Sequence, residues 1–342
     1  MTSAATATWQ INKAVVRSAN GVVAAQSRLA AEAGARVLAG GGNAVDAAVT
    51  TAFALGVVEP WLSGIGGGGF LVAVDREGNA DALDFNVRAP AGLDASRYRL
   101  RGGKDGDWFD WPAVADDLNV SGYQSICVPG SVAGLAEALR KLGTISFAEA
   151  LGPAIAYADQ GLTIDWYSAL AIAMDAASLA RFPTSAALFL DDGFPPRVPD
   201  RGKLVRPMHG MAMLLKRLAE AGAQDFYRGE IAAALLRDLS VGGNAITQDD
   251  LAGYEPRWLP PLRTTYRGRT LYAVPGLRGG PRVPSGRGVH RGVHRRRRLR
   301  DDVRPRVHQL GRLGDGWIGG AHPRRVRRLD VRDALRRLSF AR

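Results

Sequence analysis

Gly64-Ile65-Gly66-Gly67-Gly68-Gly69 stands between a helix-like segment that ends at Glu59-Pro60 and an apolar run at residues 70–74. Three of these glycines have the spacing of a dinucleotide-binding fingerprint, which requires a strand before the glycines and a helix after them. Here the order is reversed, so we reject a nucleotide-binding interpretation. The glycines indicate instead a backbone that takes unusual φ/ψ values or that another group approaches closely.

The segment before the glycines predicts two helices separated by a short break. Residues 29–38 are Ala-rich and apolar, and the glycines at 40–42 end this helix. Asn43 is expected as the N-cap of the second helix, with Asp46 at the third helical position, where the positive helix end favours a carboxylate. The second helix is expected to end near Glu59, because a residue before proline is pushed out of the α region.

The segment after the glycines predicts a mixture of strands, loops and helices. Residues 70–74 and 82–85 predict a β-hairpin around a turn at Gly78. Residues 97–124 are irregular and charged, with Trp108, Phe109 and Trp111 close together, and predict a long loop. A functional loop and an ordinary insertion explain this segment equally well.

Helical spacing then returns, and the chain closes on two strands. The expected elements are a helix over 132–142, a short helix capped by Ser146 and Glu149, a further helix restarted by Pro153 and ended by Gly161, a Met-containing core helix over 208–218, a helix over 231–239, a short helix capped by Thr247 and Asp250, and strands at 261–266 and 270–274.

Composition places the chain among soluble globular proteins, with 46% hydrophobic and 23% charged residues. The lone Cys127 has no partner for an internal disulfide, and we expect it to be a buried, inert residue. Residues 1–25 lack the apolar core of a signal peptide, and no stretch reaches the roughly 20 apolar residues of a membrane span. We therefore expect a cytoplasmic protein that does not contact a membrane.

The net charge of +12 belongs to one end of the sequence. Residues 278–342 contain 20 Arg and five Asp, with no Lys and no Glu, which is a balance of +15, whereas the rest of the chain has a balance of −3. The body therefore shows no electrostatic footprint for nucleic acid. Hydrophobic periodicity also stops near residue 277, so we divide the chain into a domain at 1–277 and an Arg-rich tail at 278–342.

Several motifs in this order resemble the large subunit of γ-glutamyltransferases. They are Gly41-Gly42-Asn43-Ala44-Val45-Asp46-Ala47-Ala48, Val57-Val58-Glu59-Pro60, Ser63-Gly64-Ile65-Gly66-Gly67-Gly68-Gly69-Phe70, Ala89-Pro90, Val128-Pro129-Gly130-Ser131-Val132-Ala133-Gly134-Leu135, Phe226-Tyr227-Arg228-Gly229, Gly242-Gly243-Asn244-Ala245-Ile246-Thr247, Asp249-Asp250-Leu251-Ala252-Gly253-Tyr254 and Tyr266-Arg267-Gly268. The resemblance covers about residues 15–277.

The resemblance implies an α/β (α+β) fold of the N-terminal nucleophile hydrolase type, a four-layer αββα sandwich. It also implies a proenzyme that cuts itself, so that the new N-terminal Thr of the small subunit becomes the nucleophile and its own α-amine serves as base. Transfer of the acyl group to water gives hydrolysis, and transfer to an amine gives transpeptidation. Backbone N–H groups of a small-subunit Gly pair would stabilise the oxyanion. No cofactor and no metal are implied.

The sequence departs from the family pattern because no nucleophilic Thr is found in a processing-site context. The last Thr is Thr270, inside a predicted strand, and Ser285 and Ser339 lie in the tail. We therefore expect no catalytic residue in this chain, no activity of the chain alone, and an incomplete sandwich that needs a small subunit. An Arg-rich stretch without Lys is what GC-rich codons give out of frame, so a frameshift near codon 278 is our interpretation of the tail. A basic nucleic-acid-binding tail is the competing one, and His290 with His294 lacks the Glu of a zinc-protease motif.

A second departure concerns the substrate-binding residues. The family places an Arg that clamps the substrate α-carboxylate two residues after an Asp, and a guanidinium suits that task. The segment here is Asp84-Phe85-Asn86-Val87-Arg88-Ala89-Pro90, so Asn86 occupies the Arg position. Arg88 would lie on the same side of a strand and could substitute, or it forms an ordinary surface ion pair. Asn86 and Arg88 are the predicted substrate-binding residues.

The expected function is that of a γ-glutamyltransferase-like protein whose intact parent hydrolyses or transfers γ-glutamyl groups of a small-molecule amide. An amidohydrolase that acts on another amide, such as a small acidic amide or an acyl side chain, is the first alternative, and an inactive structural or interaction protein is the second. A homodimer is left open.

Overall fold

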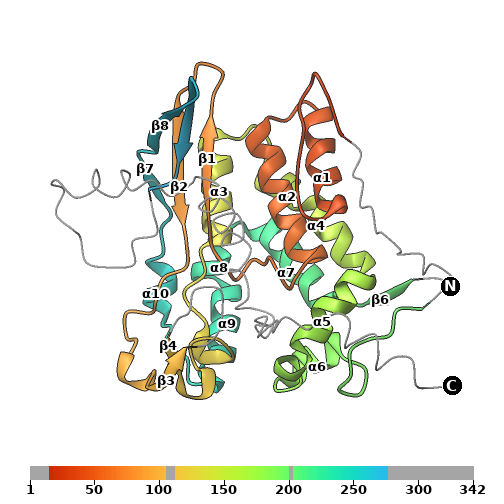
Figure 1. Ribbon diagram of the computed structural model, residues 1–342, viewed down its shortest axis with the longest axis vertical. Helices are drawn as coiled ribbons and strands as arrows, with labels where there is room; N and C mark the ends of the chain where they lie inside the picture. The colour runs from red at the N-terminus through yellow and green to blue at the C-terminus, as the bar shows by residue number, and fades with distance from the viewer. Residues whose placement is uncertain (1–14, 105–111, 200–202, 276–342) are drawn as a thin grey trace, which may run out of the picture.

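The computed structural model describes residues 15–104, 112–199 and 203–275, and the fold is given for these ranges (Figure 1). Its helices are α1 (Arg28–Ala39), α2 (Ala44–Val58), α3 (Ser131–Leu142), α4 (Phe147–Gln160), α5 (Trp166–Leu179), α6 (Pro183–Phe189), α7 (His209–Ala221), α8 (Asp225–Arg228), α9 (Glu230–Val241) and α10 (Gln248–Ala252). Its strands are β1 (Gly69–Val74), β2 (Ala80–Phe85), β3 (Leu100–Lys104), β4 (Pro112–Val114), β5 (Leu162–Ile164), β6 (Leu204–Arg206), β7 (Arg257–Leu259), β8 (Leu262–Tyr266) and β9 (Arg269–Ala273).

One three-stranded antiparallel sheet organises the fold, in the order β1-β2-β7. The other described strands form two-stranded pairs, β3-β4, β5-β6 and β8-β9. In Figure 1 helix α3 lies between the sheet and the bundle that contains α1, α2 and α4. The described residues therefore mix helix and sheet as expected, with one three-stranded sheet and three two-stranded ones.

The two faces of this sheet differ in what covers them. Successive side chains of a strand point to opposite faces, and the register pairs Leu71 with Leu83 and Leu83 with Trp258 on one face. Leu83 is fully buried there in the main core. The other face carries Val72 and Val74, residues that stay 38% and 51% exposed. This outer face carries the two exposed valines and the Asp84–Arg257 ion pair, and it is only partly covered by the described residues.

The predicted break between the first two helices is confirmed. The Asn43 side chain accepts hydrogen bonds from the backbone N–H groups of Val45 and Asp46, and Asp46 returns a bond to the Asn43 N–H at 2.8 Å. The fully buried Asp46 also accepts from the Thr144 N–H, the Thr144 hydroxyl and the Ile145 N–H. One carboxylate thus caps α2 and holds the loop between α3 and α4.

Two predictions about local structure are wrong. Pro153 does not begin a helix but lies inside α4, whose capping box at Ser146 and Glu149 starts a single helix of 14 residues. Packing of the neighbouring Leu151 and Ala154, both fully buried, stabilises α4 despite the N–H that proline lacks. Residues 97–124 are not a plain loop, since β3 and β4 pair within them. Trp108, Phe109 and Trp111 lie outside the described residues, as does the whole tail at 278–342.

Two glycines of the cluster, Gly68 and Gly69, are required by close approach rather than by unusual backbone angles. A Cβ on Gly68 would lie 2.5 Å from the Val87 N, and one on Gly69 would lie 2.8 Å from the Phe85 ring. Neither glycine has a positive φ. The strand β1 follows the cluster, so the arrangement of a dinucleotide site is absent here.

Burial in the core distinguishes the predicted Met-containing helix from Cys127. Met208 and Leu215 on the predicted Met-containing helix are buried in the core. Cys127 is half-buried rather than fully buried, and burial raises the pKa of its thiol. Across the described residues, we find no helix with the length and apolar character that crossing a bilayer requires.

Candidate functional site

The candidate site is the segment that leaves β2, where both predicted substrate-binding residues lie. Strand β2 ends at Phe85, and Arg88 then forms a bridge with Val128 through two backbone hydrogen bonds of 3.1 and 2.8 Å. Because the strand ends before Asn86, the alternation that would place Asn86 and Arg88 on one side does not extend to them.

Asn86 is half-buried and is held mainly through its backbone. Its N–H donates to the Asp84 carboxylate at 3.0 Å, and its carbonyl accepts from the Tyr254 hydroxyl at 2.8 Å. Its side-chain oxygen accepts from the Val87 N–H at 2.9 Å. The side-chain nitrogen has no partner among the described residues, so position 86 offers a neutral amide donor where the family places a guanidinium.

Arg88 is already engaged within the protein. Its guanidinium donates a hydrogen bond to the Glu255 carbonyl, and it lies over the Tyr254 ring with 4.7 Å between the guanidinium carbon and the ring centroid. A cation over an aromatic face is attracted by the ring quadrupole. The side chain forms no surface ion pair in the described structure, and its charge is directed to Tyr254 and a carbonyl, while its substrate-binding role stays a prediction.

Tyr254 organises this segment. It is buried and stacks on Tyr227, with ring centroids 5.7 Å apart and planes inclined by 14°. The Tyr227 hydroxyl donates to the Pro129 carbonyl at 3.0 Å and accepts from the Ala133 N–H at 3.1 Å. Burial raises the pKa of both phenols. Both phenols stay protonated, and their hydroxyl groups donate hydrogen bonds from fixed positions.

The motifs noted in the sequence meet at this point of the fold. The Gly67 carbonyl accepts from the N–H groups of Gly130 and Ser131 at 2.7 and 2.9 Å, which ties the glycine cluster to the start of α3. A Cβ on Gly130 would lie 2.1 Å from the Phe85 carbonyl oxygen and 2.2 Å from the Tyr254 hydroxyl. Segments more than 100 residues apart in the sequence therefore pack against one another around residues 85–88.

The sequence that makes these contacts matches a known family across most of the chain. The family profile described as Gamma-glutamyltranspeptidase matches residues 30–284. This chain belongs to the γ-glutamyltranspeptidase family.

Relatives and solved structures agree on the family. The chain is 34% identical over 271 residues to the glutathione hydrolase proenzyme of Pseudomonas sp. (strain A14), covering 77% of this chain and 44% of that protein. It is 36% identical over 284 residues to the acylase ACY 1 proenzyme of Pseudomonas sp. (strain SE83), covering 83% of this chain and 48% of that protein. The Helicobacter pylori γ-glutamyltranspeptidase superposes with a TM-score of 0.68 at 31% identity, covering 77% of this chain and 72% of that one.

The family relation confirms the predicted N-terminal nucleophile hydrolase type of fold. The chain spans less than half the length of the two curated relatives. Thr270 does not fit an N-terminal nucleophile, because it is an internal residue of β9 that pairs with Thr265. Among the described residues, no group of three or more His, Cys, Asp and Glu side chains is placed to hold a metal ion.

Sequence reasoning missed the residues that hold the segment, Tyr254 and Glu255. Tyr254 closes the motif at 249–254, so the resemblance already contained it. Its contact with Asn86 spans 168 positions in the chain, and no local pattern encodes such a pairing.

Replacing Tyr254 with phenylalanine is expected to lower the free energy of unfolding by about 1–2 kcal/mol. The variant keeps the stacked ring but leaves the Asn86 carbonyl without its donor in a part-buried place. Urea unfolding followed by circular dichroism measures the loss. Tyr272→Phe is a matched control, because its hydroxyl bonds the Gly78 carbonyl at an exposed turn. An equal effect of the two substitutions would contradict the positioning role of Tyr254.

Proposed function

We propose that this chain supplies the large-subunit half of an autoprocessing amide hydrolase or acyltransferase and does no amide chemistry by itself. The observation that carries the proposal is the match to the family over residues 30–284 together with the coverage of less than half of each relative. The nucleophilic Thr and the oxyanion donors would come from a small-subunit half. Two relatives are called proenzymes, which fits a precursor that is cut in two.

The substrate is proposed to be a small-molecule amide, with two classes to distinguish. A γ-glutamyl amide agrees with the glutathione hydrolase relative. Asn86 carries no guanidinium, and the guanidinium of Arg88 is bound to the Glu255 carbonyl and the Tyr254 ring. Both observations favour an amide substrate whose α-carboxylate, if it has one, is not clamped by an arginine at this position. The acylase relative, at 36% identity, agrees with this second class.

Complementation tests whether hydrolysis needs both halves and which substrate class is preferred. The 342-residue chain is co-expressed with the small-subunit half of the acylase relative, and the complex is assayed with γ-glutamyl-p-nitroanilide and with an aliphatic acyl-p-nitroanilide. We expect hydrolysis only when both halves are present, and a preference for the acyl anilide. A small-subunit half whose N-terminal Thr is replaced by Ala is the matched control. Hydrolysis by the 342-residue chain alone would contradict the proposal, and a preference for the γ-glutamyl anilide would select the first substrate class.

The outer face of the β1-β2-β7 sheet is proposed to pack against the small-subunit half. Val72 and Val74 are exposed on it, and β1 pairs with one strand only in the described structure. Open sheet edges and exposed apolar faces promote association. The chain alone is therefore expected to aggregate, through contacts between copies of the same face.

Replacing Val72 and Val74 together with threonine is expected to raise the soluble fraction of the chain several-fold and to weaken capture of the small-subunit half. Threonine keeps the β-branched shape and adds a polar group. Soluble yield, size-exclusion chromatography and pull-down measure the two effects. Val205→Thr, at a valine of similar exposure on β6, is the matched control and should change neither. Unchanged capture by the double variant would place the interface elsewhere, and a defined two-chain species would indicate a homodimer.

The tail at 278–342 is proposed to arise from a shift of reading frame in the coding DNA. Lys and Glu are absent from residues 278–342, which begin where the hydrophobic periodicity stops, and this supports the proposal. Translation of the DNA from the codon of Thr265 in all three frames tests it. A second frame that continues the family pattern to a Thr would support it. If no frame continues the pattern, the alternatives are an inactive interaction protein or a basic tail whose salt-dependent binding to nucleic acid is measurable.

A further inference from the structure

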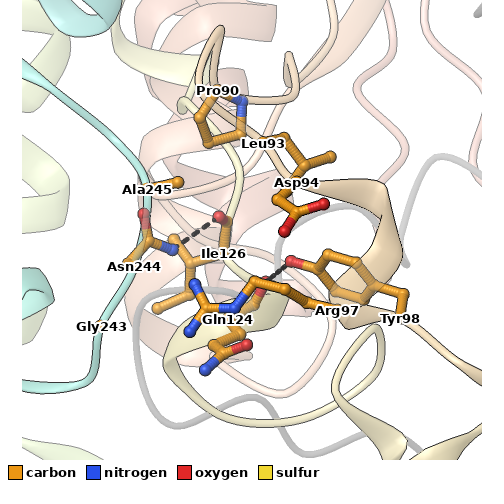
Figure 2. Close-up of a pocket in the computed structure, with 10 residues that line it drawn as sticks. All are labelled: Pro90, Leu93, Asp94, Arg97, Tyr98, Gln124, Ile126, Gly243, Asn244 and Ala245. Carbon is orange, nitrogen blue, oxygen red and sulfur yellow. Dashed lines mark hydrogen bonds between the residues drawn. The ribbon is translucent and has the colours of Figure 1, made fainter.

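The hollow beside the candidate site is too small for a ligand. Hydrogen bonds close it, since the Tyr98 hydroxyl donates to the Gln124 carbonyl at 2.8 Å and the Asn244 side-chain nitrogen donates to the Ile126 carbonyl at 3.0 Å, as Figure 2 shows. Its internal volume is about 10 Å³, which holds about one water molecule. A surface outside the candidate site offers more to a partner.

The outer face of α5, which consists of the exposed residues 166, 170, 173, 174 and 177, is apolar. Trp166, Leu170 and Met174 are 72%, 50% and 43% exposed, and their spacing of four residues places them in one row along the helix. Asp175, the one charged residue of α5, points inward and is only 6% exposed. A helix that is apolar all round is normally covered by another part of a protein.

The outer face of α5 and the outer face of the sheet lie on different parts of the domain. In Figure 1 helices α5 and α6 lie at the end of the helical bundle that is far from the β1-β2-β7 sheet. The sheet packs on α3, whereas α5 packs mainly on α6 and β5. A small-subunit half on the outer face of the sheet therefore does not account for the apolar face of α5.

The outer face of α5 is complementary to a second copy of itself. A row of alanines, two exposed and one half-buried, lies beside the row of large side chains. In an antiparallel pair of α5 helices whose two-fold axis passes between residues 171 and 172, each large side chain meets an alanine of the other copy. Ridges of large side chains then fill the grooves over the small ones. The facing pairs are Trp166 with Ala177, Leu170 with Ala173 and Met174 with Ala169.

The charges at the two ends of α5 also match in this arrangement. Asp165 precedes the helix, Arg181 follows its last residue by two positions, and both are exposed. An antiparallel pair brings the Asp165 end of one copy to the Arg181 end of the other. One Asp165 oxygen accepts from the Ser168 N–H and hydroxyl at 2.8 and 2.7 Å, and the second has no hydrogen bond to a described residue. Opposite charges at both ends favour this orientation over the parallel one.

We propose that the outer face of α5 binds a second copy of this chain, as an antiparallel helix pair with two-fold symmetry. In such an interface the same patch occurs on both sides, so the patch must match itself, as the large and small rows of α5 do. A helix of 14 residues is about 21 Å long. A contact of this size lies at or below the low end of stable interfaces, which bury about 1,200–2,000 Å². The dimer is therefore weak and reversible, and it does not depend on the amide chemistry proposed above.

Sedimentation equilibrium of the full 342-residue chain tests the dimer. The Val72→Thr, Val74→Thr variant serves as the parent, because it limits association through the sheet. We expect a monomer–dimer equilibrium with a dissociation constant on the order of 10 µM. Leu170→Glu places two carboxylates near the two-fold axis and should raise this constant by roughly tenfold or more. Met213→Glu, at a methionine of α7 that is 68% exposed, is the matched control and should leave it unchanged.

An exchange of large and small side chains tests the register. Leu170→Ala leaves a gap and Ala173→Leu overfills one, so each alone should weaken the dimer by roughly fivefold. Together in one chain they again place a leucine opposite an alanine and should restore most of the affinity. Both positions are exposed, so the monomer keeps its fold, which circular dichroism verifies. A double variant that binds no better than the single ones would overturn the register.

Cysteine pairing tests the contact even where copies also associate in other ways. Cys127 is the one cysteine of the sequence and is replaced by alanine throughout. Trp166→Cys and Ala177→Cys in one chain lie 11 positions apart on α5, about 16 Å, which is too far for a disulfide within one copy. Oxidation should therefore give a linked two-chain product, whereas Trp166→Cys alone should not, because its two copies lie at opposite ends of the pair. Equal linking of the single and double variants would indicate non-specific association and overturn the proposal.

Two further results would also overturn it. One is a parent chain that stays monomeric at about 100 µM, well above the expected dissociation constant. The other is a Leu170→Glu variant that dimerises like its parent but captures the small-subunit half more weakly, because the outer face of α5 would then belong to that half.

Discussion

Replacement of Asp46 by alanine is expected to lower the free energy of unfolding by about 3–5 kcal/mol. The substitution removes a fully buried carboxylate and leaves the N–H groups of Asn43, Thr144 and Ile145 without their acceptor. Each unsatisfied buried donor costs about 1–3 kcal/mol. Urea unfolding on the soluble Val72→Thr, Val74→Thr background measures the loss. A loss below about 1 kcal/mol would show that water or a shifted loop satisfies these donors.

The same carboxylate predicts a pH dependence. Burial acts to raise the pKa of Asp46, but the hydrogen bonds from Thr144, Asn43 and Ile145 outweigh burial and lower it below the usual value. A depressed folded pKa contributes stability that is present above the unfolded pKa of about 4 and is lost as the pH falls below it. We expect the Asp46→Ala variant to lose less stability than its parent between pH 5 and pH 3, taken as roughly the window of that titration.

An exposed aspartate gives the matched control. Asp159 pairs with Lys216 at 2.8 Å, and both side chains are about half exposed. Surface ion pairs contribute about 0–1 kcal/mol, so Asp159→Ala should be nearly neutral. If both substitutions destabilise equally, the loss does not come from the buried network.

The part of Asp46's role that the sequence predicts is the local part. Asn43 and Asp46 lie three residues apart, and the capping pairs at Ser146 with Glu149 and at Thr247 with Asp250 have the same spacing. A cap is encoded within one helical turn, so each of the three was predictable. The bonds from Asp46 to the loop after α3 cross 98 positions. They follow from the packing of α2 against α3, which the sequence pattern does not contain.

The elements that were missed lack a local pattern. Strands β5, β6 and β7 have three residues each, too few for an alternation to be seen. Helix α5 leaves Trp166, Leu170 and Met174 exposed beside buried Ile172, so its hydrophobic pattern has little contrast. Strand β7 owes its place to pairing with β2, about 170 residues earlier in the chain.

The candidate site, too, was predictable from the sequence only in part. The resemblance pointed to Asn86 and Arg88 by their positions, and the structure places both at the meeting point of the motifs. The engagement of Arg88 depends on Glu255 and Tyr254, which no pattern near Arg88 indicates. A substitution at the other end of the domain, where Tyr254 and Glu255 lie, can therefore change binding at residue 86.

Replacement of Gly134 by alanine is expected to destabilise the fold by about 3 kcal/mol. Gly134 lies in α3, where alanine normally stabilises a helix by about 1 kcal/mol relative to glycine. Here a Cβ would lie 2.1 Å from the Phe85 Cγ and 2.2 Å from its Cβ. These atoms are at the root of the side chain, so the ring cannot swing away and β2 must shift. Overpacking of this kind costs about 1–3 kcal/mol and occasionally more.

Gly152→Ala is the matched control, because Gly152 is also helical and a Cβ there meets nothing within 4 Å. It should stabilise the chain by about 0.5–1 kcal/mol. The opposite signs of two identical substitutions would separate packing from helix propensity, and equal signs would contradict the contact with Phe85. Phe85→Gly removes both contacted atoms and should recover part of the loss in Gly134→Ala, and a coupling of about 1 kcal/mol or more in that double-mutant cycle would locate the strain between α3 and β2. Because Asn86 follows Phe85 directly, the same shift carries the candidate site with it, so Gly134→Ala should also alter substrate selection in the complemented enzyme.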